Sequence, residues 1–132
     1  MKRMDALNII TGRVLTAAFR VHSALGPGLL ESAYQACLAY ELHQMRLKAD
    51  VQVALPVTYD QIRLEVGYRL DIVVEQQVIL ELKAVNQLLP IHEAQLLSYL
   101  KMSGLPVGLL INFHEVRLKD GIRRLINTKP SP

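Results

Sequence analysis

Apolar residues in the first third of the chain recur at steps of three and four, which is the spacing of one buried helix face. In the first such stretch these positions are Leu7, Ile10, Val14, Ala17, Ala18 and Val21. We expect this helix to run from about Asp5 to Ala24 and to end before Gly26-Pro27-Gly28. The same spacing continues from Leu30 to about Met45 and predicts a second helix.

The middle of the chain changes to a period of two, which is typical of strands with one buried face. The alternating apolar residues of the first strand are Val51, Val53, Leu55 and Val57. A turn is expected at Asp60-Gln61. The segments Tyr68–Val74 and Val78–Ala84 predict two further strands on either side of Glu75-Gln76-Gln77.

The last third begins with Pro90, which is well placed in the first turn of a helix. That helix is expected to reach Met102 and to end before Gly104. Residues Val107–Phe113 are continuously apolar and predict a buried strand, after which a short basic element closes the chain. The pattern therefore predicts one mixed α/β domain over residues 1–132, with a core at about 5–126 and a short basic C-terminal tail.

Composition narrows the class of protein. The chain has 132 residues, of which 51% are apolar and 20% charged, and this balance excludes a disordered chain. No apolar run reaches the about 18 residues that a membrane span needs. The single cysteine, Cys37, excludes an internal disulfide and a cysteine-rich zinc site. We expect a soluble protein of a reducing compartment, the cytoplasm.

The net charge of +3 is unevenly distributed. Residues 1–116 carry 10 basic and 11 acidic groups, so the positive excess lies in the last 16 residues. The basic residues there are Arg117, Lys119, Arg123, Arg124 and Lys129. Such a segment can dock phosphates, but a solvated helix or tail is the more common interpretation of such a charge run.

Two acidic residues are brought together if the strands 68–74 and 78–84 form a hairpin. A three-residue loop pairs Val74 with Val78 and therefore Asp71 with Glu81. A two-residue loop would place the two carboxylates on opposite faces and bury one of them in an apolar layer. The hydrophobic pattern favours the three-residue loop.

Alternation then divides each strand between two faces. On the first strand, Arg69, Asp71 and Val73 are expected to face away from Leu70 and Ile72. On the second, Ile79, Glu81 and Lys83 are expected to face away from Leu80 and Leu82. Asp71, Glu81 and Lys83 are thus predicted on one face.

Directly opposed carboxylates lie about 5 Å apart at Cβ and repel each other. They need a proton, a cationic neighbour or a metal ion, and Mg²⁺ prefers one or two carboxylates with water and phosphate oxygens. Lys83 beside such an ion could orient or deprotonate its water, or balance charge on a phosphate. The alternative is an exposed ion-pair network of Arg69, Asp71, Glu81 and Lys83.

Two motifs carry a resemblance to a known family. The pattern Asp71-(nine residues)-Glu81-x-Lys83 resembles the short signature of the PD-(D/E)XK nuclease superfamily. The segment Gly28–Tyr34, with Glu31 between, resembles the more specific motif of the GxxExxY family, a small single-domain branch. The likeness covers about residues 9–126 and continues through Val21-His22, Leu25–Pro27, Glu81–Ala84, His92–Gln95, Tyr99-Leu100 and Gly108–Phe113.

The resemblance implies a restriction-endonuclease-like core, in which helices flank a mixed sheet with an antiparallel three-stranded meander in the order α-β-β-β-α-β. It implies that Asp71, Glu81 and the backbone carbonyl of Leu82 bind Mg²⁺ or Mn²⁺. Glu31 would complete the metal shell directly or through water. Lys83 would be the water-activating or charge-stabilising lysine.

The helix after the lysine strand extends this resemblance. Gln95 and Tyr99 resemble the Gln-x-x-x-Tyr element of exonuclease-like branches, with Gln95 as a catalytic residue and Tyr99 as a contact to nucleic acid. Their spacing of four places them on one helix face, with His92 three residues earlier. The sequence departs from the superfamily pattern at Leu70, where many members have a proline.

These residues also have structural interpretations. Glu31 falls in the first turn of its helix, where a carboxylate stabilises the helix without a metal. His92 would hydrogen-bond near a helix start. Residues expected to pack in or against the core are Tyr34, Tyr99, His22 and Cys37.

Together these patterns predict a metal-dependent nuclease that hydrolyses phosphodiester bonds of nucleic acid, DNA above all, with a metal-activated water. Its basic C-terminal residues, Arg117, Lys119, Arg123 and Arg124, would grip the backbone without reading sequence. A homodimer would offer a larger face to duplex DNA. The alternatives are a non-hydrolytic nucleic-acid- or partner-binding module with a structural metal site, and a hydrolase of a small phosphorylated compound.

Overall fold

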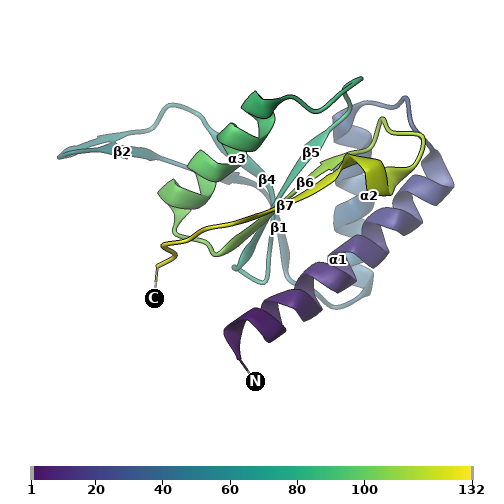
Figure 1. Cartoon of the computed structure of the whole chain (residues 1–132), viewed down its shortest axis with the longest axis horizontal. Coiled ribbons are helices and arrows are strands. Elements are labelled where there is room, and N and C mark those ends of the chain that lie inside the picture. The colour runs from purple at the N-terminus through teal and green to yellow at the C-terminus, as the bar shows by residue number, and fades with distance from the viewer. Residues whose placement is uncertain (1, 132) are drawn as a thin grey trace.

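A five-stranded mixed sheet separates two layers of helix in residues 2–131, which the computed structural model describes (Figure 1). Helices α1 (Arg3–Leu25) and α2 (Glu31–Gln44) pack on one face of the sheet, and α3 (Pro90–Ser103) packs on the other. The three predicted helices are confirmed, each within two residues of its expected ends. None of the helices in residues 2–131 is both long and apolar enough to cross a lipid bilayer.

The sheet has the spatial order β1-β4-β5-β6-β7. Its strands are β1 (Ala49–Ala54), β4 (Arg69–Val74), β5 (Val78–Lys83), β6 (Val107–Asn112) and β7 (Ile122–Ile126). The first three form an antiparallel meander, and β6 returns parallel to β5 after α3. This mixed α/β arrangement confirms the predicted fold class and is consistent with a restriction-endonuclease-like fold.

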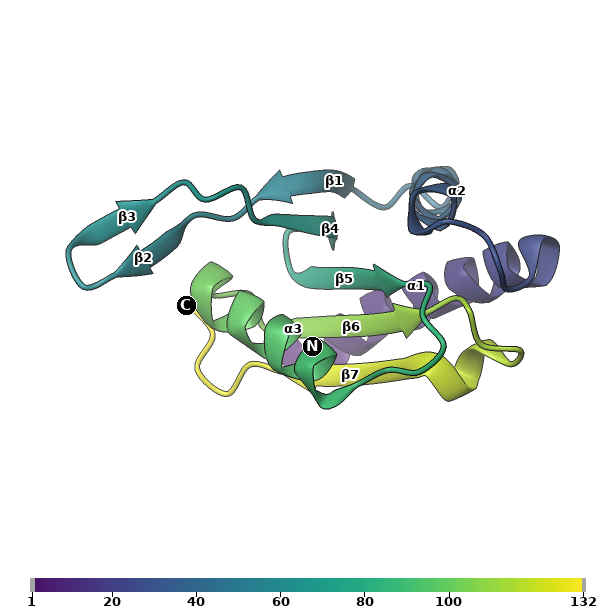
Figure 2. The ribbon, with the colours of Figure 1, turned by 90° about the horizontal axis from the view of Figure 1, so that it is seen from above.

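A two-stranded ribbon, β2 (Val57–Tyr59) and β3 (Ile62–Leu64), projects beyond the sheet between β1 and β4 (Figure 2). The predicted strand over residues 51–57 is thus divided in two. The division falls at Pro56, which has no N–H to donate to a ladder. The predicted turn at Asp60-Gln61 is confirmed, but the sequence pattern does not predict β3.

The basic C-terminal segment is part of the sheet. The 3₁₀ turn η1 (Leu118–Gly121) leads into β7, which pairs antiparallel with β6 as an edge strand. The interpretation of this segment as a solvated helix or tail is therefore wrong for residues 122–126, which form β7. Edge strands commonly carry charged side chains that discourage further pairing, and the exposed Arg123 and Arg124 hide the strand pattern.

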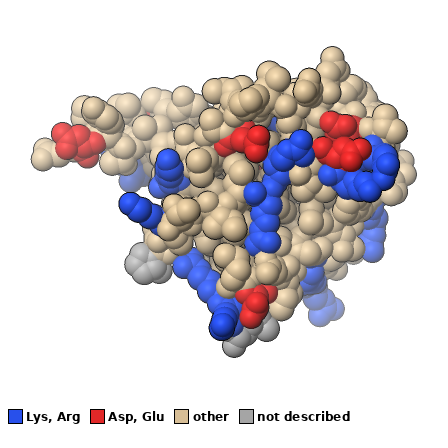
Figure 3. Space-filling view, in the orientation of Figure 1, with Lys and Arg blue, Asp and Glu red and all other residues tan. Residues whose placement is uncertain are grey.

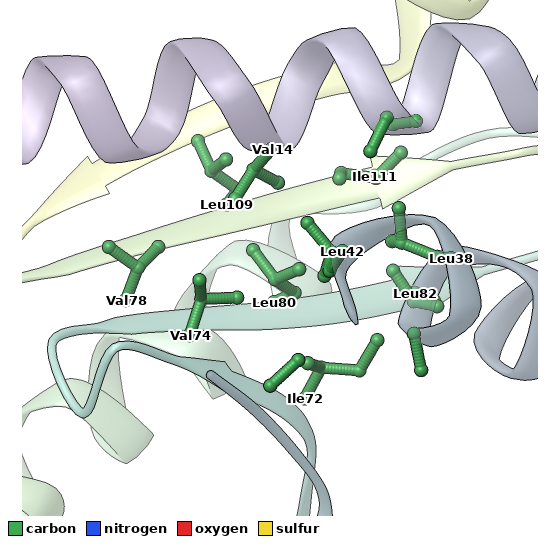
Figure 4. Packing of buried hydrophobic residues seen from close by; sticks show 14 of the residues in the cluster. Val14, Leu38, Leu42, Ile72, Val74, Val78, Leu80, Leu82, Leu109 and Ile111 are labelled. Carbon is green, nitrogen blue, oxygen red and sulfur yellow. The ribbon is translucent and has the colours of Figure 1, made fainter. Parts of the chain in front are cut away.

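The larger apolar core lies between the sheet and α1 and α2. Figure 4 shows Val14 of α1 and Leu38 and Leu42 of α2 packed over the sheet residues Ile72, Val74, Val78, Leu80, Leu82, Leu109 and Ile111. A smaller core under α3 contains Leu70, Val73, Ile79, Leu96, Leu100 and Leu110. Burial of each such side chain contributes about 1.5–3 kcal/mol, so the sheet is held rigidly from both sides.

Candidate metal centre

The β4–β5 hairpin has the register predicted for a three-residue loop. Val74 pairs with Val78, Val73 with Ile79 and Ile72 with Leu80. Continuing this register places Asp71 directly opposite Glu81. The hydrophobic pattern and the loop length together were sufficient to predict this juxtaposition.

The two carboxylates take the place of backbone carbonyls at this point of the hairpin. The Asp71 N–H donates to Glu81 Oε1 at 3.2 Å, and the Leu82 N–H donates to Asp71 Oδ2 at 2.8 Å. The backbone ladder ends at the Ile72–Leu80 pair. The strands therefore separate around a pair of acidic side chains that are held by main-chain donors.

The expected alternation of β4 is wrong beyond Asp71. Leu70 belongs to the core under α3, together with Val73, whereas Ile72 belongs to the core under α1 and α2. Leu70 was expected on the same face as Ile72. The alternation of faces is interrupted at Asp71. Its two neighbours, Leu70 and Ile72, point to opposite faces of the sheet, whereas in a regular strand they would share one face.

Two hydrogen bonds at the ends of the β1–β4 pair show where this change occurs. On one side of Asp71 the Glu75 N–H donates to the Lys48 carbonyl, and on the other side the Leu55 N–H donates to the Tyr68 carbonyl. In a regular antiparallel ladder, successive hydrogen-bonded pairs are two residues apart along each strand. These two bonds are an odd number of residues apart on both strands, so one regular ladder cannot contain both of them. Both strands turn over between these two bonds.

Burial dominates the electrostatics of the acid pair. Glu81 is only 5% exposed, and burial, followed by the charge of Asp71, raises its pKa from the ordinary 4.5 to about 8. Lys83 opposes this rise in the pKa without pairing, since none of the ion pairs in residues 2–131 includes Asp71, Glu81 or Lys83. The alternative of an exposed ion-pair network is therefore wrong.

Helix α3 covers the pair from one side. Tyr99 is 6% exposed, and its pKa is raised by burial and next by the charge of Glu81. Its ring centroid lies 6.1 Å from that of Tyr68. These two residues and Gln95 line a groove of about 390 Å³ between α3 and the base of the ribbon. The structure thus brings Gln95 and Tyr99 to the same groove beside the acid pair.

His92 has a local structural role. Its Nδ1 accepts a hydrogen bond from the Leu89 N–H at 3.0 Å, at the start of α3. The interpretation of His92 as a residue that stabilises the helix start is confirmed.

Tyr34 also has a structural role, and it fixes the start of α2. Its hydroxyl donates to the Gly26 carbonyl at 2.6 Å and accepts from the Leu29 N–H at 3.1 Å. Its ring stacks on Phe113 with centroids 4.6 Å apart. Gly26 has a φ of 68°, in the left-handed region that favours glycine. Tyr34 therefore fixes the loop between α1 and α2, and this loop determines where Glu31 lies.

Glu31, the first residue of α2, is exposed and lies on the side of the acid pair opposite to α3. It shares a pocket of about 460 Å³ with Asp71, Leu82, Gln35 and Gln52, together with Ser32. Within residues 2–131, no three Asp, Glu, His or Cys side chains are gathered closely enough to hold a metal ion. Asp71 and Glu81 are therefore brought together, whereas Glu31 shares a pocket with Asp71 but not with Glu81 and does not complete the expected three-acid cage.

This donor set suits a hard divalent cation. Mg²⁺ is commonly held by one or two carboxylates, with water filling the other positions. A buried carboxyl whose pKa is raised by a neighbouring carboxylate is stabilised in its charged form when a cation binds between them. The Asp71–Glu81 pair, with the adjacent pocket, fits such an ion.

A family comparison agrees with this geometry. The model of the PD-(D/E)XK nuclease superfamily matches residues 8–125. The chain belongs to the PD-(D/E)XK nuclease superfamily. Nucleases of this superfamily generally use divalent metals, and membership indicates a nuclease that acts on nucleic acid. No curated protein and no solved structure matches the chain.

Two residues of this PD-(D/E)XK site are not predicted from the sequence. Asn112 is fully buried next to Lys83 in the β5–β6 register, and its side chain both donates to the Val85 carbonyl and accepts from the Val85 N–H, at 2.9 and 3.1 Å. It fixes the chain that follows Lys83. The position of Asn112 at the end of a continuously apolar strand is a signal from which its structural role could be predicted. The second residue, Gln52, gives no such signal.

The basic residues of the PD-(D/E)XK chain do not form one surface. Arg123 lies in the same row of the sheet as Glu81, two strands away and on the same face. Arg124 lies on the opposite face, 3.7 Å from Met4 Sδ. Arg117 and Lys119 are on the segment that follows β6, at the end of the sheet where β5 also ends. Figure 3 shows Lys and Arg at separate places among acidic residues.

Proposed function

We propose that this PD-(D/E)XK protein is a metal-dependent nuclease of the GxxExxY branch, which hydrolyses phosphodiester bonds of DNA. The observation that carries the proposal is the Asp71–Glu81 pair, in which Glu81 is buried and both carboxylates accept from main-chain N–H groups. Lys83 lies beside the pair, and none of the ion pairs in residues 2–131 includes Asp71, Glu81 or Lys83. When both carboxyl groups of this pair are ionised they repel each other, and a bound cation would neutralise their charge.

The metal would be Mg²⁺ or Mn²⁺, held by Asp71, Glu81 and the Leu82 carbonyl, with Glu31 contributing from the shared pocket. When bound, such an ion acts as a Lewis acid and lowers the pKa of water so that it can attack phosphorus. A direct contact from Glu31 is not required, because water can complete the shell of Mg²⁺.

The chain's own residues would supply the remaining functions. Lys83 is half-buried on the same strand face as Glu81, where an ammonium group stabilises negative charge that develops on a phosphate. Gln95 would orient the scissile phosphate or the attacking water from α3. Tyr99 and Tyr68 line the groove, and the exposed ring of Tyr68 is the aromatic face against which a nucleotide would lie, with the buried Tyr99 supporting it.

Phosphates outside the site would contact the basic residues that share its face or its end of the sheet. These are Arg123, Arg117 and Lys119. Arg124 lies on the opposite face, so its contribution to the same duplex is smaller. A homodimer would enlarge this face, and light scattering would test for the dimer. The location would be the cytoplasm, because the half-buried thiol of Cys37 suits a reducing compartment.

A cleavage panel tests the proposal. Labelled single-stranded, duplex, nicked and branched DNA would be incubated with increasing Mg²⁺ or Mn²⁺, and metal binding would be measured separately by calorimetry. We expect Lys83→Ala to reduce turnover by at least about 100-fold while it still binds metal. Lys48→Ala, an exposed lysine near the hairpin loop, is the matched control and should leave turnover unchanged.

Three results would contradict the proposal. Unchanged cleavage by Lys83→Ala would exclude the assigned role of the lysine. Salt-sensitive DNA binding without products at any metal concentration would instead indicate the non-hydrolytic module. Hydrolysis of small phosphorylated compounds without DNA binding would indicate the third class of function.

A further inference from the structure

Gln52 has an unusual backbone conformation at the point where β1 passes Asp71. The pairs Val51–Ile72 and Val53–Leu70 place Gln52 directly opposite Asp71. Its φ of 51° lies in the left-handed region, which is strained for a residue other than glycine, above all inside a strand. This strain is located at the acid pair and not at a turn.

The conformation releases the Asp71 N–H from the strand ladder. In the phase set by the Glu75–Lys48 bond, Asp71 and Gln52 would be a hydrogen-bonded pair. The Gln52 carbonyl instead accepts from Arg69 Nη1 at 3.1 Å, and the Asp71 N–H donates to Glu81 Oε1. The contact between the two acidic residues therefore depends on the turned backbone of Gln52.

The side chain of Gln52 contacts the same carboxylate. Its Nε2 donates to Gln35 Oε1 at 2.7 Å and lies 3.5 Å from Asp71 Oδ1, a long hydrogen bond. The other oxygen, Asp71 Oδ2, accepts from the Leu82 N–H. Both carboxylate oxygens thus have a donor from the protein, which restricts rotation of the group. Gln35 ties this arrangement to α2, the helix that carries Glu31.

We propose that Gln52 is a positioning residue of the metal site, which orients the Asp71 carboxylate through its side-chain amide and through its left-handed backbone. The inference rests on the proposed function, since Asp71 is taken to bind a divalent cation. Partners of this kind, which hold a metal ligand without touching the metal, commonly change metal affinity by about 10- to 100-fold when they are replaced.

Gln52→Gly separates this role from a purely structural one. Glycine adopts a φ of 51° without strain but has no amide, so the variant should melt at the same temperature as the wild type or higher. We expect its affinity for Mn²⁺ and Mg²⁺, measured by calorimetry, to fall by about 10-fold. Gln52→Glu, which places a carboxylate near Asp71 Oδ1, should not restore the wild-type affinity for the ion.

Gln76→Gly is the matched control. Gln76 is exposed in the β4–β5 loop with a φ of 55°, so this substitution relieves similar strain away from the metal site. It should raise the melting temperature without changing the affinity for Mn²⁺.

The outcomes separate the inference from the function on which it rests. If the wild type binds the ion and Gln52→Gly binds it within twofold of the same affinity, Gln52 has no positioning role. If the variant loses affinity together with melting temperature, the effect is one of stability and the inference is likewise overturned. A wild type that binds neither ion refutes the proposed function itself.

Discussion

The burial of Glu81 predicts that the metal-free protein loses stability as the pH rises. Its pKa is raised to about 8 in the folded protein, mainly by burial and next by Asp71, against an ordinary value of 4.5. Between these two values the folded state binds more protons than the unfolded state. Stability therefore falls from about pH 5 to about pH 9. This direction is opposite to that of a carboxylate stabilised by an ion pair, whose pKa is lowered.

The size of the effect follows from the same interval. Each pH unit between the two pKa values contributes about 1.4 kcal/mol, so the full interval gives an upper limit of about 5 kcal/mol. That limit is comparable with the net stability of about 5–15 kcal/mol of an ordinary domain. Since the pair can relax by admitting water, we expect a loss of at least about 2 kcal/mol, or about 6 °C in melting temperature.

The assay compares the wild type with Glu81→Gln by urea unfolding from pH 5 to 9 in a chelator. The amide resembles the protonated acid, because it can still accept from the Asp71 N–H and donate to the Asp71 carboxylate. The difference between the two unfolding free energies should be small at pH 5 and should favour the variant at pH 9. Added Mg²⁺ should restore the wild type at pH 9 more than the variant.

Glu93→Gln on α3 is the control, because it removes a carboxylate outside the pair. Its stability should follow the pH dependence of the wild type. If the curves of the wild type and Glu81→Gln run parallel across this range, the raised pKa of Glu81 is refuted. The close contact of the two carboxyl groups would then need another explanation.

Three further results are expected. Asp71→Asn should raise the melting temperature of the metal-free protein at pH 8–9, measured by calorimetry, because it removes the charge that opposes ionised Glu81; an unchanged or lower value would argue against crowding. Tyr34→Phe removes the hydroxyl that donates to the Gly26 carbonyl, so urea unfolding should show a loss of about 1–2 kcal/mol, with metal affinity preserved. Arg123→Ala should weaken DNA binding and reduce the salt slope by about 1 in anisotropy titrations. Arg124→Ala should have a smaller effect, and equal effects would contradict their placement on opposite faces.

The parts of the fold that could be predicted are those where burial constrains the pattern. The helices follow from apolar steps of three and four, and the hairpin register follows because a shift of one residue would bury a carboxylate in the core. The ribbon strand β3 is exposed along its whole length, so no core face imposes a recognisable pattern on it. In β7, exposed arginines occupy adjacent positions, and two strand faces cannot be distinguished from such a sequence.

The residues of the candidate site also fall into those whose positions the hydrophobic pattern predicts and those whose positions it does not. Asp71, Glu81 and Lys83 could be placed together because they lie on adjacent strands whose register is fixed locally. Glu31 and Asp71 are 40 residues apart in sequence, and their relative position depends on how α2 packs on the sheet. Gln52 could not be found, because a left-handed φ at a glutamine has no signature in residue type. Its contact with Asp71 depends on the change of alternation that the regular two-residue period does not anticipate.

The break in the sheet at Asp71 and the proposed affinity for a cation have one physical origin. In an uninterrupted ladder the N–H groups of Asp71 and Leu82 would donate to carbonyls, and the two carboxylates would project freely and separate. Here those donors hold the carboxylates in contact at 3.2 and 2.8 Å from the backbone nitrogens, so repulsion cannot relax by rotation. A proton relieves this repulsion, and a divalent ion bound at the proposed site would relieve it as well. Competition between these two occupants would then make metal affinity rise with pH over the range in which metal-free stability falls.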